Sequence, residues 1–341
     1  MRVFKYRGGP PEIFRRDLES LKNDYFWAPS REFLNDPCEG LYNRSPLDDQ
    51  LGLIGSIFTS GKKSVEKSFL DVKSAVESLF SFVDKVGIYS LAKSENEELL
   101  WAHYAYGHKG FCVEYDLDKL ILFENQEYKV IDVIYSDRPL KLGSSEILTN
   151  PDQNIFLKKL IGAKPDSWKY EKEIRVITPS QGRHDYDFRA VKSIYFGLRM
   201  PDEQKLSIME SMMGRGIQYK QMALIDGTYK MTMSDVDDPF VSSPTYKYEI
   251  SPISEHAITP ELVREDMKKY VEYLYRAAEV VRREPYCSLV EMVEFSTTKG
   301  DSENPVVFVQ YNRNEKRFFN HYLTLREIDE AYSSIHDLQV K

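Results

Sequence analysis

The sequence of 341 residues has few cysteines and no long hydrophobic run. Its three cysteines, Cys38, Cys112 and Cys287, lie far apart and form no Cys-x-x-Cys pair, so a disulfide framework is not expected and a reducing compartment is indicated. The longest nearly apolar stretch, residues 51–58, is too short to cross a bilayer. The first residues lack the apolar region of a secretory signal. These features predict a soluble, cytoplasmic protein without a membrane partner.

Several common catalytic motifs are also missing. The chain contains no Gly-x-Gly-x-x-Gly, Walker or Gly-x-Ser-x-Gly pattern, which argues against the phosphate-binding loops and the nucleophile elbow that these motifs build. The formal net charge is −8 and the pI is about 5.5, so duplex nucleic acid is a poor electrostatic partner. Aromatic residues make up 13% of the chain, which favours stacking surfaces or aromatic-rich packing.

The pattern of strands and helices predicts an α+β fold with a mixed or antiparallel sheet and flanking helices. Apolar residues at steps of three and four predict a helix over 62–85, and a capping-box pattern predicts another from Ser94 to Tyr106. Strands are predicted over 4–7, 87–91, 111–116, 130–135, 171–178, 191–196, 219–224 and 228–233, with a further helix over 202–213.

An acidic, turn-rich segment divides the chain. We therefore predict a domain over 1–235, a linker over 236–258 and a small tail module over 259–341. In the tail, a helix from Thr259, strands over 288–297 and 305–311, and a helix over 325–335 give an α-β-β-α order. Chemically informative residues are scarce in this module, so it is interpreted as a packing or oligomerisation module.

The most informative segment for chemistry runs from Trp168 to Ile177. If it is a strand, Glu171, Glu173 and Arg175 point to one face, and the two carboxylates lie roughly 6.5–7 Å apart. One carboxylate of such a pair can hold a ribose and stabilise an oxocarbenium-like centre while the other orients a nucleophile. A solvent-facing Glu–Arg ladder on a sheet explains the same pattern without any activity.

A second cluster surrounds the predicted turn at Gly107. Trp101, His103, Tyr104 and His108 can line the end of a helix, where a nicotinamide or nucleobase could stack. The alternative is that these rings belong to the hydrophobic core. A metal site made of His103, His108 and Cys112 matches no standard ligand spacing, so no metal is expected.

Two further places could contribute to a pocket. Asn35, Asp36 and Glu39 flank a proline in a pattern typical of turns, and the same residues could form the rim of a site. Arg7 is the last residue of the first predicted strand and could hold a phosphate with two hydrogen bonds, although a lone arginine in such a place is usually a surface residue.

The order of these pieces resembles a known family. Residues 4–7, 33–39, 88–90, 101–104 with 108–111, 168–175 and 195–200 are similar to the bacterial domain-of-unknown-function family 2971, which is related in sequence to AbiGi-type abortive-infection proteins. The resemblance covers roughly residues 3–235 and leaves the tail outside. It implies a prokaryotic cytoplasmic protein in phage defence or a toxin–antitoxin pair, and it implies no established reaction.

A more distant similarity links the chain to ADP-ribosyltransferases. Those enzymes use an Arg or His on the first strand, a Ser or Tyr on a middle strand and a Glu in a Glu-x-Glu strand. Arg7, Ser90 and Glu171-Lys172-Glu173 occur here in that order. The similarity implies that Arg7 braces the cofactor phosphates, Ser90 supports the cleft and Glu173 holds the nicotinamide ribose.

Three functions stay open at this point. The first is an NAD-consuming ADP-ribosyltransferase or NAD glycohydrolase, in which Glu173 and Glu171 are the catalytic residues. The residues expected to bind NAD are Arg7, Ser90, Trp101, His103 and Tyr104. Other candidates for the pocket are Asn35, Asp36, Glu39, His108 and Arg175. The second is a non-enzymatic, antitoxin-like module that regulates a protein partner, a hypothesis based on the acidic tail, because an acidic protein can mask a basic partner. The third, a nuclease with Asp36, Glu39, Glu114 and Glu173 on Mg²⁺, lacks a motif.

Overall fold

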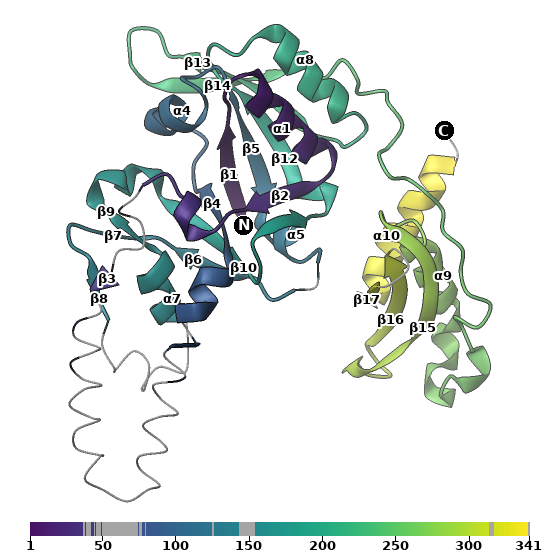
Figure 1. The fold of residues 1–341 in the computed structure, drawn as a ribbon. Helices are drawn as coiled ribbons and strands as arrows, with labels where there is room; N and C mark the ends of the chain where they lie inside the picture. Colours follow the sequence, from purple (N-terminus) through teal and green to yellow (C-terminus); the bar gives the residue numbers. More distant parts are fainter. Residues whose placement is uncertain are drawn as a thin grey trace, which may run out of the picture. The chain divides into compact units, whose positions relative to one another are not determined.

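The computed structural model describes residues 1–36, 80–124, 126–142, 154–313 and 317–339, and the single positions 38, 42, 43, 45, 49, 74, 77 and 78. The chain forms two compact units, Met1–Ser243 and Pro244–Lys341 (Figure 1). The junction between them falls inside the segment predicted as a linker, 236–258. Strands and helices follow one another irregularly, so the fold is α+β, as the sequence predicts.

An eight-stranded mixed sheet forms the centre of the N-terminal unit. Neighbouring strands are antiparallel, except that β12 and β13 run parallel. In spatial order the strands are β14 (Met231–Val236), β13 (Gln218–Leu224), β12 (Val191–Phe196), β5 (Phe111–Asp116), β1 (Arg2–Arg7), β4 (Gly87–Ala92), β10 (Glu173–Thr178) and β6 (Lys129–Asp132).

Smaller strand pairs and short helices surround this sheet. The pairs are β2 (Tyr25–Ala28) with β11 (Gly182–Asp185), β3 (Tyr42–Asn43) with β8 (Leu140–Lys141), and β7 (Ile134–Ser136) with β9 (Ala163–Pro165). The helices are α1 (Pro11–Lys22), α4 (Glu98–Tyr104), α5 (Leu117–Ile121), α7 (Asn154–Ile161) and α8 (Asp202–Ser211), with 3₁₀ turns η1 (Arg31–Phe33), η2 (Asp166–Glu171) and η3 (Phe188–Ala190).

The two faces of the central sheet are covered by different helices. Because successive side chains alternate along a strand, Val3 on β1 and Leu91 on β4 contribute to one face, where they share an apolar cluster with residues of α1 and α8. The opposite face carries two separate clusters: Phe4 of β1 packs with residues of α4, and Ile88 of β4 packs with residues of α7. Between these two clusters, Ser90 and Arg175 occupy paired positions on β4 and β10.

The sheet pairs weakly at one internal position. Strands β1 and β5 pair along six residues, whereas β1 and β4 pair only at Phe4↔Ala92. Beyond that point the Lys5 ammonium donates a hydrogen bond to the Ser90 carbonyl oxygen, at 2.8 Å, in place of a main-chain bond. The gap between β1 and β4 therefore admits a charged side chain into the middle of the sheet.

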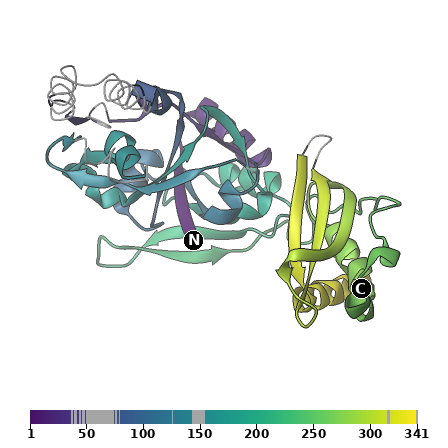
Figure 2. The same cartoon turned by 90° about the horizontal axis from the view of Figure 1, so that it is seen from below.

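The C-terminal unit has its own hydrophobic core. Its antiparallel sheet has the order β15 (Cys287–Gly300), β16 (Pro305–Arg313) and β17 (Arg317–Thr324), and α9 (Val271–Val281) and α10 (Leu325–Gln339) pack against one face (Figure 2). Two 3₁₀ turns, η4 (Pro260–Leu262) and η5 (Glu265–Tyr270), precede α9. In the described part of the chain, no helix combines the length and apolar character needed to traverse a bilayer.

The predicted α-β-β-α order of the tail is wrong by one strand, β17. Its inward positions include Phe319, His321 and Leu323, so a histidine and the polar residues around it obscure the alternation that marks a strand. The predicted helix from Thr259 also begins later, at Val271, because the preceding residues form 3₁₀ turns.

Other differences affect the N-terminal unit. The strand predicted over 130–135 is divided at Val133 into β6 and β7, which belong to different sheets. The strand predicted over 171–178 begins at Glu173, because the preceding residues form η2. Most of the helix predicted over 62–85 lies outside the described residues, and so does Glu39.

Candidate functional site

The candidate site lies on the sheet face between the α4 and α7 clusters. Glu173 is the first residue of β10, and it pairs with Ala92 of β4. Its side chain accepts a hydrogen bond from the side chain of Ser90, which is two residues from Ala92 and on the same face. The main-chain N–H of Glu173 donates to the Tyr135 hydroxyl at 2.8 Å, which holds the start of the strand in place.

Glu171 reaches the same site by a different backbone route. It ends η2, and Lys172 then adopts a left-handed conformation with φ of 45° and ψ of 47°. Side-chain alternation along a continuous strand therefore does not explain why Glu171 and Glu173 are neighbours. The single left-handed residue turns the chain so that both carboxylates contact one ammonium group, that of Lys164.

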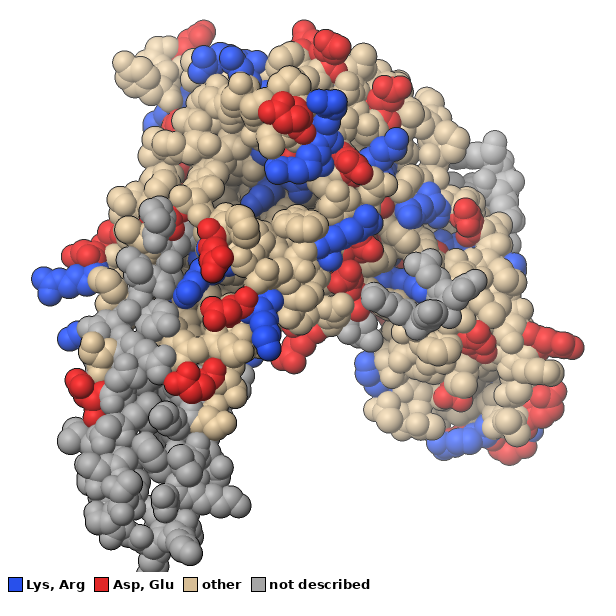
Figure 3. Space-filling view, viewed as in Figure 1, with Lys and Arg blue, Asp and Glu red and all other residues tan. Residues whose placement is uncertain are grey.

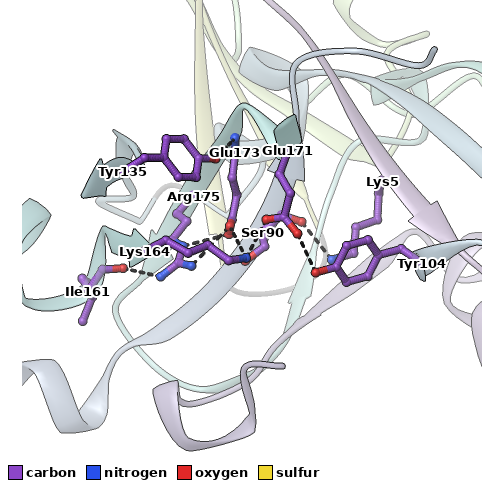
Figure 4. A network of polar contacts seen from close by, with 9 residues as sticks. All are labelled: Lys5, Ser90, Tyr104, Tyr135, Ile161, Lys164, Glu171, Glu173 and Arg175. Atoms are coloured by element: carbon purple, nitrogen blue, oxygen red, sulfur yellow. Dashed lines mark hydrogen bonds and ion pairs between the residues drawn. The ribbon is translucent and has the colours of Figure 1, made fainter. Parts of the chain in front are cut away.

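Lys164 links the two carboxylates. Its Nζ lies 2.5 Å from Glu171 Oε2 and 3.2 Å from Glu173 Oε2, and its side chain is 3% exposed (Figure 4). The lysine comes from β9, which runs directly into η2. A buried ammonium between two buried carboxylates offsets their mutual repulsion.

Arg175 completes the pairing of Glu173. Its Nε donates to Glu173 Oε1 at 2.8 Å, and its Nη1 donates to the Ile161 carbonyl oxygen at 2.5 Å. Burial opposes ionisation of Glu173, but the positive charges of Arg175 and Lys164 outweigh it and lower the pKa of this carboxyl to about 2. Glu173 is therefore a fixed negative charge.

The environment of Glu171 shifts its pKa in the other direction. Burial raises the pKa of Glu171, and this effect exceeds the opposing effects of Lys164 and of the Tyr104 hydroxyl, which donates to Glu171 Oε1 at 2.6 Å. The Asn35 side chain in turn hydrogen-bonds Tyr104. Two adjacent carboxyls with pKa values shifted in opposite directions are suited to different roles in acid–base chemistry. We call Ser90, Tyr104, Lys164, Glu171, Glu173 and Arg175 the carboxylate network.

An aromatic rim of His103, Trp168 and Tyr170 borders this network. The ring centroids of Trp168 and Tyr170 are 6.1 Å apart, and His103 lies 6.3 Å from Trp168 and 6.4 Å from Tyr170. Trp168 and Tyr170 are half-buried and His103 is exposed, so the rim joins the buried network to the surface. Flat ligands stack on side chains of this kind.

Part of the chain is similar to a known protein family. Residues 100–176 match the model of a family described as "Protein of unknown function (DUF2971)". This segment of the chain is therefore similar to the DUF2971 family. The match is shorter than the resemblance over 3–235 suggests, but it includes Tyr104, Lys164, Glu171, Glu173 and Arg175. No match was found among curated proteins or among solved structures.

Several residues predicted for the site do lie together. Glu171, Glu173, Arg175, Ser90 and Tyr104 belong to the carboxylate network, His103 belongs to the rim, and Asn35 contacts Tyr104. The interpretation of the Glu-x-Glu strand as a solvent-facing ladder is wrong, because Glu171, Glu173 and Arg175 are 5%, 6% and 0% exposed.

Arg7 does not join them. It lies on β1 with the same alternation as Val3, and its guanidinium donates to Ser20, Tyr89 and Tyr115 on the face covered by α1. Arg7 is enclosed by these partners and is turned away from Glu173. The predicted convergence of Arg7 with the two acids is therefore not found in this structure.

Other predicted residues serve different roles. Trp101 is fully buried in the α4 cluster and donates from its indole N–H to the Glu95 carbonyl oxygen. The His108 ring stacks on Trp101, with the ring centroids 6.4 Å apart, and the Asp36 side chain accepts a hydrogen bond from the Cys38 amide in a turn. Among the described residues, no group of three His, Cys, Asp or Glu side chains is arranged to hold a metal ion.

Sequence reasoning missed Lys164 and Lys5. Lys164 is preceded by Ala163 and followed by Pro165 and belongs to no motif, so only the pairing of β9 with β7 indicates its position. Lys5 lies two residues before Arg7, and its ammonium reaches the Ser90 carbonyl oxygen. Burial and the neighbouring Arg7 lower the pKa of Lys5 to about 8. Over the central strands the surface is hollowed, and Lys and Arg side chains gather beside the hollow (Figure 3).

Proposed function

We propose that the N-terminal unit is an NAD-consuming enzyme that transfers ADP-ribose or hydrolyses NAD. The observation that carries this proposal is the arrangement around Glu173: an ionised, buried carboxylate held by Ser90, beside a second carboxyl with a raised pKa and next to an aromatic rim. The strands that carry Arg7, Ser90 and Glu173 are also consecutive in the sheet, as β1, β4 and β10.

The chemistry assigns a separate role to each acid. The bond between nicotinamide and the ribose carbon breaks, and its electron pair leaves with nicotinamide and neutralises the pyridinium charge. Glu173 stabilises the positive charge that develops on the ribose. Water or another acceptor then attacks the ribose carbon and loses a proton to Glu171, whose raised pKa makes it the stronger base.

Arg7 needs a different role from the one that the distant similarity implies. Because its guanidinium is enclosed by Ser20, Tyr89 and Tyr115, we assign the contact with an anionic part of the substrate to Lys5. Lys5 is half-buried, lies in the gap between β1 and β4, and donates to the main-chain carbonyl oxygen of Ser90. Its ammonium also interacts with the charges of Glu173 and Glu171, which raise its pKa against the effect of burial. A lysine ammonium is a suitable partner for a phosphate.

The test is nicotinamide release from NAD by the purified chain. We expect Glu173→Gln to lower the rate by roughly 100- to 1,000-fold, as the loss of one charge-stabilising group does in other enzymes. Glu114→Gln is the matched control, because Glu114 is also buried and bonded to a tyrosine but lies on β5. Release that is absent in the wild-type protein, or unchanged in Glu173→Gln, would overturn the proposal.

The resemblance to abortive-infection proteins leads us to propose further that this activity serves prokaryotic defence. Expression of the wild-type chain in a bacterial host should then lower cellular NAD, whereas expression of Glu173→Gln should not. Equal NAD levels in the two cultures would argue against a defence role that acts through NAD consumption.

A non-enzymatic binding module is the second candidate. One observation favours it: Lys164 and Arg175 neutralise both carboxylates, as expected for a structural ion-pair network. In that case a protein partner should co-purify with the chain at a stoichiometric ratio from the native host, and NAD should remain intact. Failure to recover such a partner would count against this function.

A further inference from the structure

We infer that the carboxylate network and Trp168 form a binding site for a flat organic cation, and that Lys164 fills this site in the free protein. The Lys164 ammonium has three kinds of neighbour that favour positive charge. Two are the carboxylates of Glu171 and Glu173, at 2.5 and 3.2 Å. The third is the face of the Trp168 indole, whose centroid is 4.9 Å from Nζ.

The groups around the Lys164 ammonium differ from those of an ordinary salt bridge, which joins one cation to one carboxylate. Two carboxylates and an indole face surround one Nζ, and Glu173 is also paired with Arg175. The two cations balance the two acids, so departure of Lys164 leaves one negative charge that an external cation can neutralise. Tyr170 and His103 extend the aromatic surface outward from Trp168. A cation with an aromatic ring would contact this surface as well as the acids, which an alkyl ammonium does only in part.

The proposal requires Lys164 to leave the site by rotation of its side chain. Its side chain has four rotatable bonds, and β9 is a strand of only three residues that pairs with β7 alone among the described strands. An external cation must therefore compete with an internal one. Removal of the internal occupant increases the apparent affinity by the inverse of the fraction of time for which the site is open.

The choice of a pyridinium as the external cation rests on the proposed function, because the nicotinamide ring of NAD is positively charged. N-methylnicotinamide presents that ring without ribose or phosphate, and neutral nicotinamide is the uncharged comparison. Trp168 reports binding through its fluorescence. A Trp27→Phe background removes the exposed indole, while Trp101 is fully buried.

In this background we expect Lys164→Met to bind N-methylnicotinamide about tenfold or more tightly than the protein with Lys164 does. Lys164→Arg keeps the site filled and should bind as weakly as the parent protein. Lys169→Met, which removes an exposed lysine of η2, should also leave the affinity unchanged. An unaltered affinity in folded Lys164→Met, or equal affinity for nicotinamide and N-methylnicotinamide, would overturn the inference.

A second measurement covers the case in which Lys164→Met does not fold. In the wild-type protein, N-methylnicotinamide should expel the Lys164 amine and increase its acetylation by acetic anhydride several-fold, as measured by mass spectrometry. Nicotinamide should not have this effect, and acetylation that does not rise would contradict the inference.

The two proposals fail separately. Tight binding of the pyridinium by Lys164→Met without any NAD cleavage removes the enzymatic function and keeps the cation site. Cleavage of NAD by the wild-type protein, without tighter binding of the pyridinium by Lys164→Met, removes the cation site and keeps the enzymatic function.

Discussion

Two enclosed arginines of the central sheet lie on opposite faces. Arg175 contacts Glu173 in the carboxylate network, whereas Arg7 contacts Asp17, Ser20 and two tyrosines beneath α1. Charge and burial are similar at the two positions, so residue type alone does not distinguish a site residue from a structural one. The partners of each guanidinium make that distinction.

We expect Arg7→Met to destabilise the protein without changing the chemistry of the site. Loss of this guanidinium leaves buried polar partners unpaired, which costs about 3 kcal/mol of unfolding free energy. Nicotinamide release per folded molecule should stay within about twofold of the wild-type rate, because Arg7 lies on the other face of the sheet. Urea denaturation and the release assay measure the two effects. A large loss of activity at unchanged stability would assign Arg7 to the site.

At the scale of elements, the junction between η2 and β10 brings the two acids together. Lys172 is the one residue between them, and its φ of 45° is a conformation that side chains with a branched Cβ rarely adopt. The distance between the two carboxylates thus depends on the backbone conformation of Lys172, although its own side chain is exposed.

We expect Lys172→Gly to be tolerated and Lys172→Val to be harmful. Glycine adopts the left-handed conformation freely, so Lys172→Gly should change the unfolding free energy by less than about 1 kcal/mol. Valine should cost about 1–3 kcal/mol and lower nicotinamide release, because the chain would relax and separate Glu171 from Glu173.

Urea denaturation measures the unfolding free energy of each variant, and the release assay measures its rate of nicotinamide release. The control is Lys192→Val at an exposed position of β12, where a strand accommodates valine readily. If Lys172→Val matches the wild-type protein in both assays, the junction is not what positions the acids.

Most of the strands could be predicted from local sequence. The predicted bounds of β5 and β12 are confirmed, because alternation and apolar content are local properties of the chain. Glu171 and Glu173 could be predicted as site residues for the same reason, because the Glu-x-Glu spacing is a local pattern. Lys164 and Lys5 could not be identified in this way, because their roles depend on which distant segments pair with β9 and β1.

For the whole molecule, buried charge predicts how stability changes with pH. Burial opposes ionisation of Glu124, but hydrogen bonds from His184, Tyr128 and the Asp185 amide outweigh it and lower its pKa to about 2, the same value as for Glu173. Burial also opposes protonation of His184, and its bonds to Glu124 and to the Ser180 carbonyl oxygen outweigh that effect and raise its pKa.

The N-terminal unit should therefore lose stability in acid and, more gently, in base. Both glutamates bind protons more readily in the unfolded chain, so their contribution is present above about pH 4.5 and is lost as the pH falls toward 2. His184 binds its proton more tightly in the folded state, so its contribution is present below about pH 6.5 and is lost as the pH rises through its folded pKa.

Tryptophan fluorescence can follow this unit alone, since Trp27, Trp101 and Trp168 all lie within residues 1–243. We expect the urea midpoint to be highest between about pH 4.5 and 6.5. Glu124→Gln should weaken the fall of the urea midpoint at alkaline pH, because it removes the partner that raises the His184 pKa. Part of the fall at acid pH should remain in this variant, because Glu173 is still present. A midpoint that stays constant from pH 5 to 3 would contradict the assigned protonation states.

The sequence by itself determined the α+β class, the positions of most strands and the importance of the two acids, because short-range patterns of apolar and charged side chains carry that information. Only the tertiary structure decided that Arg7 faces away from the acids, that Lys164 lies between them and that Lys5 enters the gap beside Ser90. These facts depend on the order of the strands, on their register and on one left-handed backbone residue, Lys172. All three features depend on contacts between segments that are far apart in the chain, which local sequence patterns do not encode.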